Sequence, residues 1–319
     1  MNIGPKKQIL IFVCATTLMW LMVGCHSGQQ TTTPPRQVAV KDAQSIIRVF
    51  EGINSKQITW QTLLSELIFA DIIIVGEMHD DAVGHAIELL LVTDVTKNWP
   101  GTVLCLEMLE RDEQPLVDDY QDGFIDAETF QSATKSTDWA GDGSFDMWYQ
   151  PLIDVTNQNK GSVIAANAPR RYVKVARRDG YEVLEALPKP RRDFIAVPLG
   201  PVDKAYFERF TEVMGGHGEN APDPQVIEDV FRAQRVWDET MAHSIVMASE
   251  NGAQKVIHIV GQFHSDFDGG LVDAIETMAP DVSVVVISLQ PTNHLVLHED
   301  DVGRADFVIY TAPADNPSP

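Results

Sequence analysis

The sequence predicts an α/β fold in which a mostly parallel sheet is flanked by helices, with a helical insertion over one edge. Two observations support this prediction: short strands that are apolar on both faces, and helical patterns between them. The strands are expected at residues 71–77, 102–108, 162–168 and 255–261. Strands that are apolar on both faces belong to a sheet that is covered on both sides. Alternation of strands with helices indicates parallel strands joined by right-handed crossovers.

The spacing of apolar residues predicts the remaining elements. Residues 82–96 place apolar side chains on one helical face, and residues 224–250 predict a longer helix of the same kind. Residues 282–289 and 307–310 are apolar and β-branched, which predicts two later strands. The span from 110 to 160 is helical and aromatic, and it is the expected insertion over the sheet edge.

The N-terminal segment has the features of an export signal. Two lysines precede an apolar run at residues 9–23, which is short for a transmembrane helix. The run ends in LMVG directly before Cys25, and this pattern resembles the bacterial lipoprotein signal, in which the cysteine carries the lipid. We therefore expect residues 1–24 to be a signal peptide and Cys25 to be lipidated; ordinary secretory cleavage is the alternative.

The composition of the chain predicts its organisation, and the lipoprotein resemblance predicts its location. Residues 25–40 are polar with two adjacent prolines, which is typical of a flexible tether. We expect an α/β domain at residues 41–310 and a disordered tail at residues 311–319. His26, and not an aspartate, follows the cysteine. In a Gram-negative host this pattern implies an outer-membrane lipoprotein that faces the periplasm.

The charge argues against nucleic-acid binding, and the cysteine content argues against an intramolecular disulfide. The formal net charge is −22, and a surface this acidic repels phosphate backbones, so nucleic acid is not an expected partner. Once the signal is removed and Cys25 carries lipid, only Cys105 remains, so no intramolecular disulfide is expected. Cys105 lies in an apolar run and is predicted to be a small core residue.

Polar side chains follow each of the four buried strands. Glu77 and His79 end the first run, Glu107 ends the second, Arg170 follows the third, and His264 follows the fourth. In parallel sheets, ligands bind beyond the carboxyl ends of the strands. We therefore expect these side chains to converge on one cleft, where the strand ends hold them in fixed positions.

Two imidazoles and two carboxylates in one cleft suit a divalent metal ion with an open coordination position. The predicted metal ligands are Glu77, His79, Glu107 and His264. Either glutamate is an alternative candidate for the general base of a hydrolase. The ligands are scattered along the chain, so no local metal-binding motif supports the assignment.

Two of the polar residues have simpler interpretations. Glu107 precedes Arg111 by four residues, and the two are candidates for a purely structural ion pair. His85, near the start of a predicted helix, is expected to bond to a backbone carbonyl and to have no role in the cleft.

Several motifs, taken together and in order, resemble a known family. They are IIIVGEMHDD, LCLEMLERDEQPLVDDY, MWYQPL, VIAANAPRR, AQRVWDETMAHSI and IVGQFHSDFDGGL, and they extend from about residue 70 to residue 271. The combination resembles the iron-regulated haem-binding lipoproteins of the ChaN type, in the wider group that includes TIKI proteases and erythromycin-esterase-like proteins. The lipoprotein start agrees with this resemblance.

The resemblance implies haem bound between two protomers, with a tyrosine of one subunit as the iron ligand and a histidine and a lysine of the other at the propionates. Tyr149 is the first candidate for the ligand because it lies in a matching motif; Tyr120 and Tyr206 are the others. A phenolate suits ferric iron. The residues expected at the haem are Tyr149, Arg170, Arg171 and His217, of which the arginines would meet the propionates.

Three functions remain open from the sequence. The favoured one is a membrane-anchored haem-binding lipoprotein in haem and iron uptake, with a homodimer as its candidate assembly, because the family resemblance and the lipidation signal agree. The alternative is a metal-dependent hydrolase that uses the four residues of the cleft. A third is a scaffold in which the polar cleft is vestigial. Fold analogy does not separate these functions.

Overall fold

The computed structural model describes residues 36–134, 139–198, 200–201, 203–215 and 221–312. The expected signal peptide, the lipidation site Cys25, most of the tether and most of the tail lie outside these ranges, and so does His217.

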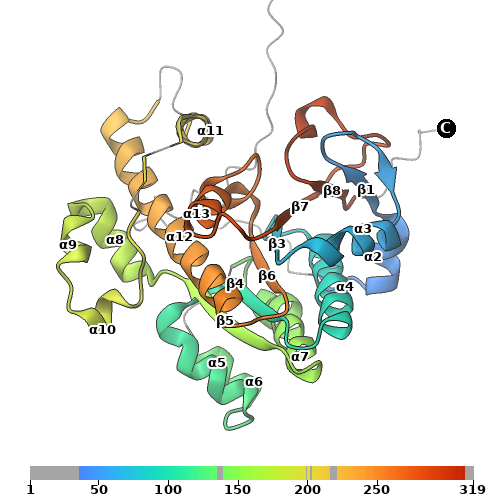
Figure 1. Cartoon of the computed structure of the whole chain (residues 1–319), viewed down its shortest axis with the longest axis horizontal. Helices are drawn as coiled ribbons and strands as arrows, with labels where there is room; N and C mark the ends of the chain where they lie inside the picture. Colours follow the sequence, from blue (N-terminus) through green and yellow to red (C-terminus); the bar gives the residue numbers. More distant parts are fainter. Residues whose placement is uncertain (1–35, 135–138, 199, 202, 216–220, 313–319) are drawn as a thin grey trace, which may run out of the picture.

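A single eight-stranded sheet forms the centre of the described molecule, in the order β2-β1-β8-β7-β3-β6-β4-β5 (Figure 1). The strands are β1 (Arg48–Glu51), β2 (Gln57–Ile58), β3 (Ile72–Glu77), β4 (Val103–Glu110), β5 (Ser162–Asn167), β6 (Val256–Gly261), β7 (Val284–Gln290) and β8 (Phe307–Tyr310). The strands from β8 to β5 in this order are parallel, and β1 is antiparallel to both β8 and β2. The predicted α/β class and the six predicted strands are confirmed within a few residues.

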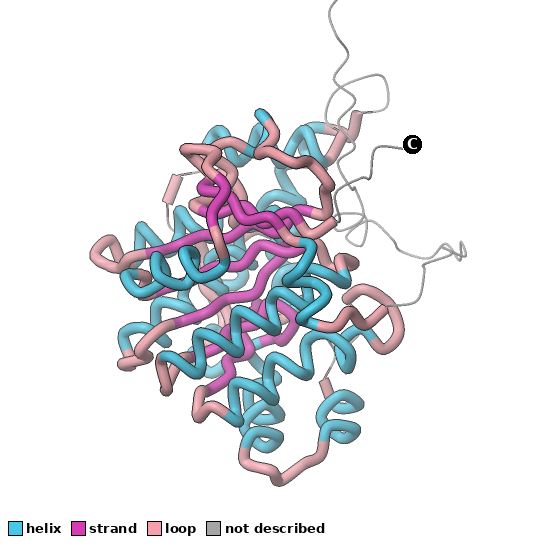
Figure 2. Tube along the Cα trace, turned by 90° about the vertical axis from the view of Figure 1, so that its right-hand side faces the viewer, coloured by secondary structure: helices cyan, strands magenta, loops and turns pink. Residues whose placement is uncertain are grey.

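Helices cover both faces of the sheet, and Figure 2 shows the strands as a layer between them. The helices are α2 (Val40–Ile46), α3 (Trp60–Glu66), α4 (Ala82–Asn98), α5 (Gln114–Gln121), α6 (Ala127–Ala133), α7 (Gln150–Gln158), α8 (Arg170–Asp179), α9 (Glu182–Glu185), α10 (Lys189–Arg192), α11 (Lys204–Val213), α12 (Pro224–Glu250) and α13 (Gly270–Met278). Short 3₁₀ turns are η1 (Leu67–Phe69), η2 (Arg111–Glu113), η4 (Gln262–His264) and η5 (Glu299–Asp301), and η3 (Phe145–Tyr149) is a π-helical turn. None of the helices in the described ranges is both long and apolar enough to cross a bilayer.

The core consists of two apolar layers, one on each side of the sheet. Along β3, Ile73 and Val75 pack into the layer under α4 and α7, whereas Ile72 and Ile74 pack into the layer under α12 and α13. This alternation follows from the two-residue period of a strand. Cys105 is fully buried in the second layer, as predicted, and burial raises the pKa of its thiol to about 12.

The predicted insertion divides into two parts. Helices α5 and α6 lie beyond the edge strand β5 (Figure 1), as expected. Helix α7 instead packs beside α4 on the face of the sheet, because Leu152 and Ile153 are buried in the apolar layer there. This arrangement brings the π-helical turn before α7, with Tyr149, close to the carboxyl ends of the strands.

Candidate functional site

Strand order places the four predicted strand ends side by side. β3, β6, β4 and β5 are consecutive in the sheet, and Glu77 of β3 is in register with Gly261 of β6. The register of β4 with β5 shifts between Leu106 and Glu110. Irregularities of this kind change the direction of a side chain, and Glu107 lies within this one. The carboxyl edge of these strands therefore carries most of the polar side chains that the sequence singled out.

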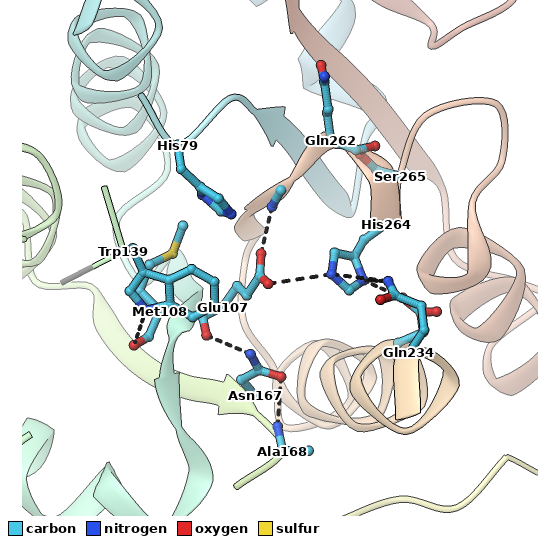
Figure 3. A network of polar contacts seen from close by, with 12 residues as sticks. His79, Glu107, Met108, Trp139, Asn167, Ala168, Gln234, Gln262, His264 and Ser265 are labelled. Carbon is cyan, nitrogen blue, oxygen red and sulfur yellow. Dashed lines mark hydrogen bonds and ion pairs between the residues drawn. The ribbon is translucent and has the colours of Figure 1, made fainter. Parts of the chain in front are cut away.

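Glu107 lies between His79 and His264 (Figure 3), and the three side chains are largely buried; this polar cluster stands at the place of the expected cleft and keeps that name. Its Oε2 accepts a hydrogen bond from the backbone N–H of Gly261 at 2.6 Å, and its Oε1 lies 3.5 Å from Nε2 of His264. Asn167, at the end of β5, donates to the backbone carbonyl of Glu107 at 2.9 Å. The carboxylate is thus fixed by contacts from β6 and from the turn η4, and the backbone of Glu107 is fixed from β5.

His264 is oriented by the long helix α12. Its Nδ1 donates to Oδ1 of Asp238 at 2.5 Å, and the hydroxyl of Tyr206 donates to the other oxygen of Asp238 at 2.9 Å. Gln234, one turn before Asp238, donates to the hydroxyl of Tyr206 at 3.2 Å. The sequence analysis did not select Gln234 or Asp238. Two polar residues four apart on an otherwise apolar helix face were the signal that would have found them.

His79 is held in the same way from the opposite side. Its Nδ1 donates to Oε1 of Glu77 at 2.6 Å, and the hydroxyl of Tyr149 donates to that same oxygen at 2.6 Å. Within the described part of the chain, Nε2 of His79 has no hydrogen-bond partner although it is buried. A Cβ at Gly261 would lie 3.2 Å from this nitrogen, so a residue without a side chain leaves room for the ring.

The charges of the cleft are strongly coupled. Burial opposes ionisation of Glu107, but the charges of His264 and His79, together with the hydrogen bonds from His264 and from the Gly261 backbone, outweigh it and lower the pKa of Glu107 to about 2. Burial would also lower the pKa of His264, yet the carboxylates of Glu107 and Asp238 outweigh it and raise that pKa to about 10. For His79, burial is likewise overcome by the hydrogen bond to Glu77 together with the charges of Glu77 and Glu107, and the pKa is raised. The cleft therefore holds ionised Glu107 next to cationic His264.

A second polar group lies behind His79, in the core. His85 and Glu88, both on α4, are buried with Glu77. Nδ1 of His85 lies 3.0 Å from Oε2 of Glu88 and 3.5 Å from Oε2 of Glu77. Burial raises the pKa of Glu77 and of Glu88 to about 7 each, and burial lowers the pKa of His85, which leaves its imidazole neutral.

The four predicted metal ligands do not form one coordination shell in this arrangement. Glu77 lies behind His79 and contacts its Nδ1, whereas Glu107 faces Nε2 of both histidines. The four side chains therefore lie in a row and do not surround one point. Arg111 points away from Glu107: it donates to Oγ of Ser244 at 2.9 Å and to the carbonyl of Thr240 at 2.7 Å. The structural ion pair considered for Glu107 and Arg111 is therefore not formed.

His85 does bond to a backbone carbonyl, that of His79 at 3.1 Å, as the simpler interpretation expected. Its other nitrogen nevertheless faces Glu77 and Glu88. The sequence analysis missed Glu88 altogether. Its spacing of three from His85 on one helix face was the available signal.

The two arginines expected at a haem are the first residues of α8. The Arg170 side chain is 48% exposed and stacks over Trp139 at 5.1 Å, and the Trp139 ring in turn lies 5.1 Å from that of His79. Arg171 pairs with Asp112 at 2.5 Å and stacks on the ring of Tyr172.

The three tyrosines proposed as iron ligands all donate to carboxylates. Tyr149 is 0% exposed and donates to Glu77, and burial raises its pKa well above the usual value. Tyr206 is also buried, with Asp238 as its acceptor, and Tyr120 donates to Asp154 at 2.7 Å. In this arrangement Tyr149 cannot reach a haem at the surface, because its hydroxyl lies inside the core behind His79.

An open groove of about 410 Å³ lies beside α12, between α11 and the start of α9. Its lining combines aromatic rings with charged groups: Tyr181, Phe207, Glu228, Phe231, Arg232 and Arg235. Phe207 and Phe231 are in edge contact, with ring centroids 4.9 Å apart. The sequence analysis did not select this surface, because its residues come from separate segments and only Arg235 lies in one of the quoted motifs.

Comparisons with known proteins agree with this fold. Residues 63–275 match the family model described as haem-binding uptake, Tiki superfamily, ChaN. The structure resembles that of ChaN of Campylobacter jejuni, solved with cofacially bound haem, with a TM-score of 0.59 and 18% identity over 83% of this chain and 96% of that one. The chloroplastic protein RETICULATA-RELATED 5 of Arabidopsis thaliana is 24% identical over 282 residues, or 81% of this chain. The chain spans only 36% of that plant protein.

Proposed function

Because the chain belongs to the ChaN family of haem-binding uptake proteins in the Tiki superfamily, we propose that it binds haem in the cell envelope as part of haem and iron uptake. The family match from residue 63 to residue 275 is the observation that carries this proposal, since it includes both the cleft and the groove. The proposed location is the outer membrane, facing the periplasm, with a lipid anchor at Cys25 and a homodimer as the binding form.

The groove beside α12 is the proposed haem surface. A porphyrin is flat and apolar with two anionic propionates, and the groove offers Phe207 and Phe231 for the ring. Arg232 and Arg235 are the cations that would bind the propionates. Such local cations matter in a chain whose formal net charge is −22.

Tyr181 is the proposed iron ligand in this groove. Its hydroxyl donates to the carbonyl of Arg232 at 3.1 Å, so ligation would replace a hydrogen bond to a neutral group and not to a buried carboxylate. Burial raises the pKa of Tyr181 to about 12, against the opposing charges of Arg235 and Arg232. Ferric iron favours an anionic oxygen ligand, and it would take the place of the phenolic proton.

Haemin titration followed by visible absorption tests this proposal. We expect a saturable Soret change with phenolate-type bands in the wild type and in Tyr149→Phe and Tyr120→Phe. Tyr181→Phe should lose the phenolate bands. Arg235→Ala should bind roughly tenfold more weakly, since it loses a charge-assisted contact, whereas the exposed Arg191→Ala on α10 is the matched control and should bind normally. Saturable binding that is lost only in Tyr149→Phe would move the site to the cleft. No saturable binding would contradict the function.

Hydrolysis is a second candidate, favoured by the symmetry of the cleft. Two imidazoles face Glu107, and each is anchored at Nδ1 by a carboxylate that also accepts from a tyrosine. Oriented imidazoles beside a carboxylate are groups that general acid–base chemistry uses. Glu107→Gln should abolish any esterase activity while leaving haemin binding unchanged. If the wild type and Glu107→Gln had equal esterase activity, Glu107 would have no role in the hydrolysis.

A further inference from the structure

We propose that Glu77, His85 and Glu88 bind one divalent first-row metal ion in the core, behind the cleft. One ligand atom from each residue lies within 4.8 Å of the others, and all three side chains are buried. This site is separate from the proposed haem groove and does not depend on haem binding. It shares only Glu77 with the metal ligands that the sequence predicted.

The hydrogen bonding of His85 prepares it as a ligand. A carbonyl only accepts, so the contact from Nε2 to the carbonyl of His79 at 3.1 Å places the proton on Nε2. The lone pair of the neutral ring is then on Nδ1, which faces Oε2 of both Glu88 and Glu77. Metal-binding histidines are commonly fixed in this way by a backbone carbonyl on the far nitrogen. A lone pair that faces two carboxyl oxygens needs a proton or a cation between them.

Two carboxyl oxygens of this group accept no hydrogen bond from the rest of the described chain. In the described residues, Oε2 of Glu77 and Oε1 of Glu88 are buried without a hydrogen bond. Buried carboxylates without a partner are costly, so the group must hold either protons or a cation. The contacts of 3.0 and 3.5 Å to Nδ1 of His85 are close to the separation of about 3.4 Å between ligands around an ion with ~2.1 Å bonds.

The surroundings fix the ligands and exclude water. Tyr149 donates to Oε1 of Glu77 at 2.6 Å, which leaves Oε2 free to coordinate. The Trp148 ring stacks on that of His85 with centroids 4.2 Å apart and closes the site on one side. One imidazole and two carboxylates suit zinc, manganese or ferrous iron better than calcium, which prefers more oxygen ligands.

Metal analysis of the purified full chain tests the site. The chain is stripped with a chelator, incubated with zinc, and passed through a desalting column before the zinc content is measured. We expect about one ion per chain in the wild type. Glu88→Gln, which keeps the shape of the side chain, should retain at least tenfold less. Glu107→Gln in the cleft is the matched control and should retain the wild-type amount.

Zinc X-ray absorption on the wild type answers the same question without a variant, in case Glu88→Gln does not fold. One imidazole among oxygen ligands supports the core site, whereas two imidazoles would place the ion in the cleft with His79 and His264. Zinc that is retained by Glu88→Gln and lost by Glu107→Gln would overturn the proposal in the same way. A wild type that retains no zinc or manganese would show that a shared proton occupies the group. Because haemin binding is measured separately, failure of either proposal leaves the other intact.

Discussion

At the scale of single residues, the cleft depends on paired charges that are kept away from water. Each histidine that faces Glu107 is held at its far nitrogen by a carboxylate. Burial disfavours every charge in this group, so the charges persist because they compensate one another. His264 shows this most clearly, since its pKa of about 10 results from Glu107 and Asp238 overcoming burial.

The raised pKa of His264 predicts a pH-dependent contribution to stability. The folded pKa of about 10 lies above the ordinary value of about 6.5. The contribution is therefore complete below about pH 6.5 and is lost as the pH rises toward 10. Urea unfolding of the wild type and of His264→Gln should differ in free energy by on the order of a few kcal/mol near pH 6. That difference should shrink near pH 9.5. A difference that stays constant over this range would refute the assigned charge of His264.

At the scale of elements, the junction between β3 and the turn η4 sets the positions of both halves of the cleft. η4 follows β6 and crosses over the end of β3, where it places His264 opposite His79. This crossing is possible because Gly76 has no side chain. A Cβ there would lie 2.5 Å from Oγ of Ser265 and 3.0 Å from Cα of Gln262, closer than packed atoms approach.

We therefore expect Gly76→Ala to destabilise the protein by about 1–3 kcal/mol, because the backbone of η4 would have to move. Gly200→Ala is the control: a Cβ at Gly200 meets nothing within 4 Å, and its effect should be within about 0.5 kcal/mol. Urea midpoints of the two variants and the wild type measure the effect. Equal stability of Gly76→Ala and the wild type would show that the backbone of η4 can move without a loss in the free energy of unfolding.

At the scale of the whole molecule, two predictions concern how the protein is anchored and assembled. The first is lipidation. In a Gram-negative host supplied with labelled palmitate, the wild type should incorporate label and fractionate with membranes. Cys25→Ser should do neither, because the acceptor thiol is missing. Label on the Cys25→Ser protein would show that lipid is attached elsewhere, and an unlabelled wild type would favour ordinary secretory cleavage.

The second prediction is that haem binding promotes assembly of two protomers. The groove is open to solvent on one side, so a haem that lies in it leaves one face uncovered. A second protomer would cover that face and bury further apolar surface. Light scattering should therefore give a larger mass with haemin than without it, and Phe207→Ala should weaken the change. A mass of one chain at saturating haemin would argue for binding within a single protomer.

The sequence by itself determined the α/β class, the strands and the strand-end residues Glu77, His79, Glu107 and His264. Strand periodicity and runs of β-branched residues are local properties, so they can be read without knowing which segments meet. Family membership was also readable, because ordered motifs survive at low identity.

Only the tertiary structure decided how these residues are paired. Asp238 and Glu88 reach the site from helices whose register against the sheet depends on packing, and no local pattern fixes it. The structure also placed Tyr149 in the core and Tyr181 in the groove, because burial of a phenol depends on the elements that cover it. The pairs His264–Asp238, His264–Glu107 and Tyr149–Glu77 join segments distant in the chain, so they are properties of the fold and not of any one stretch of sequence.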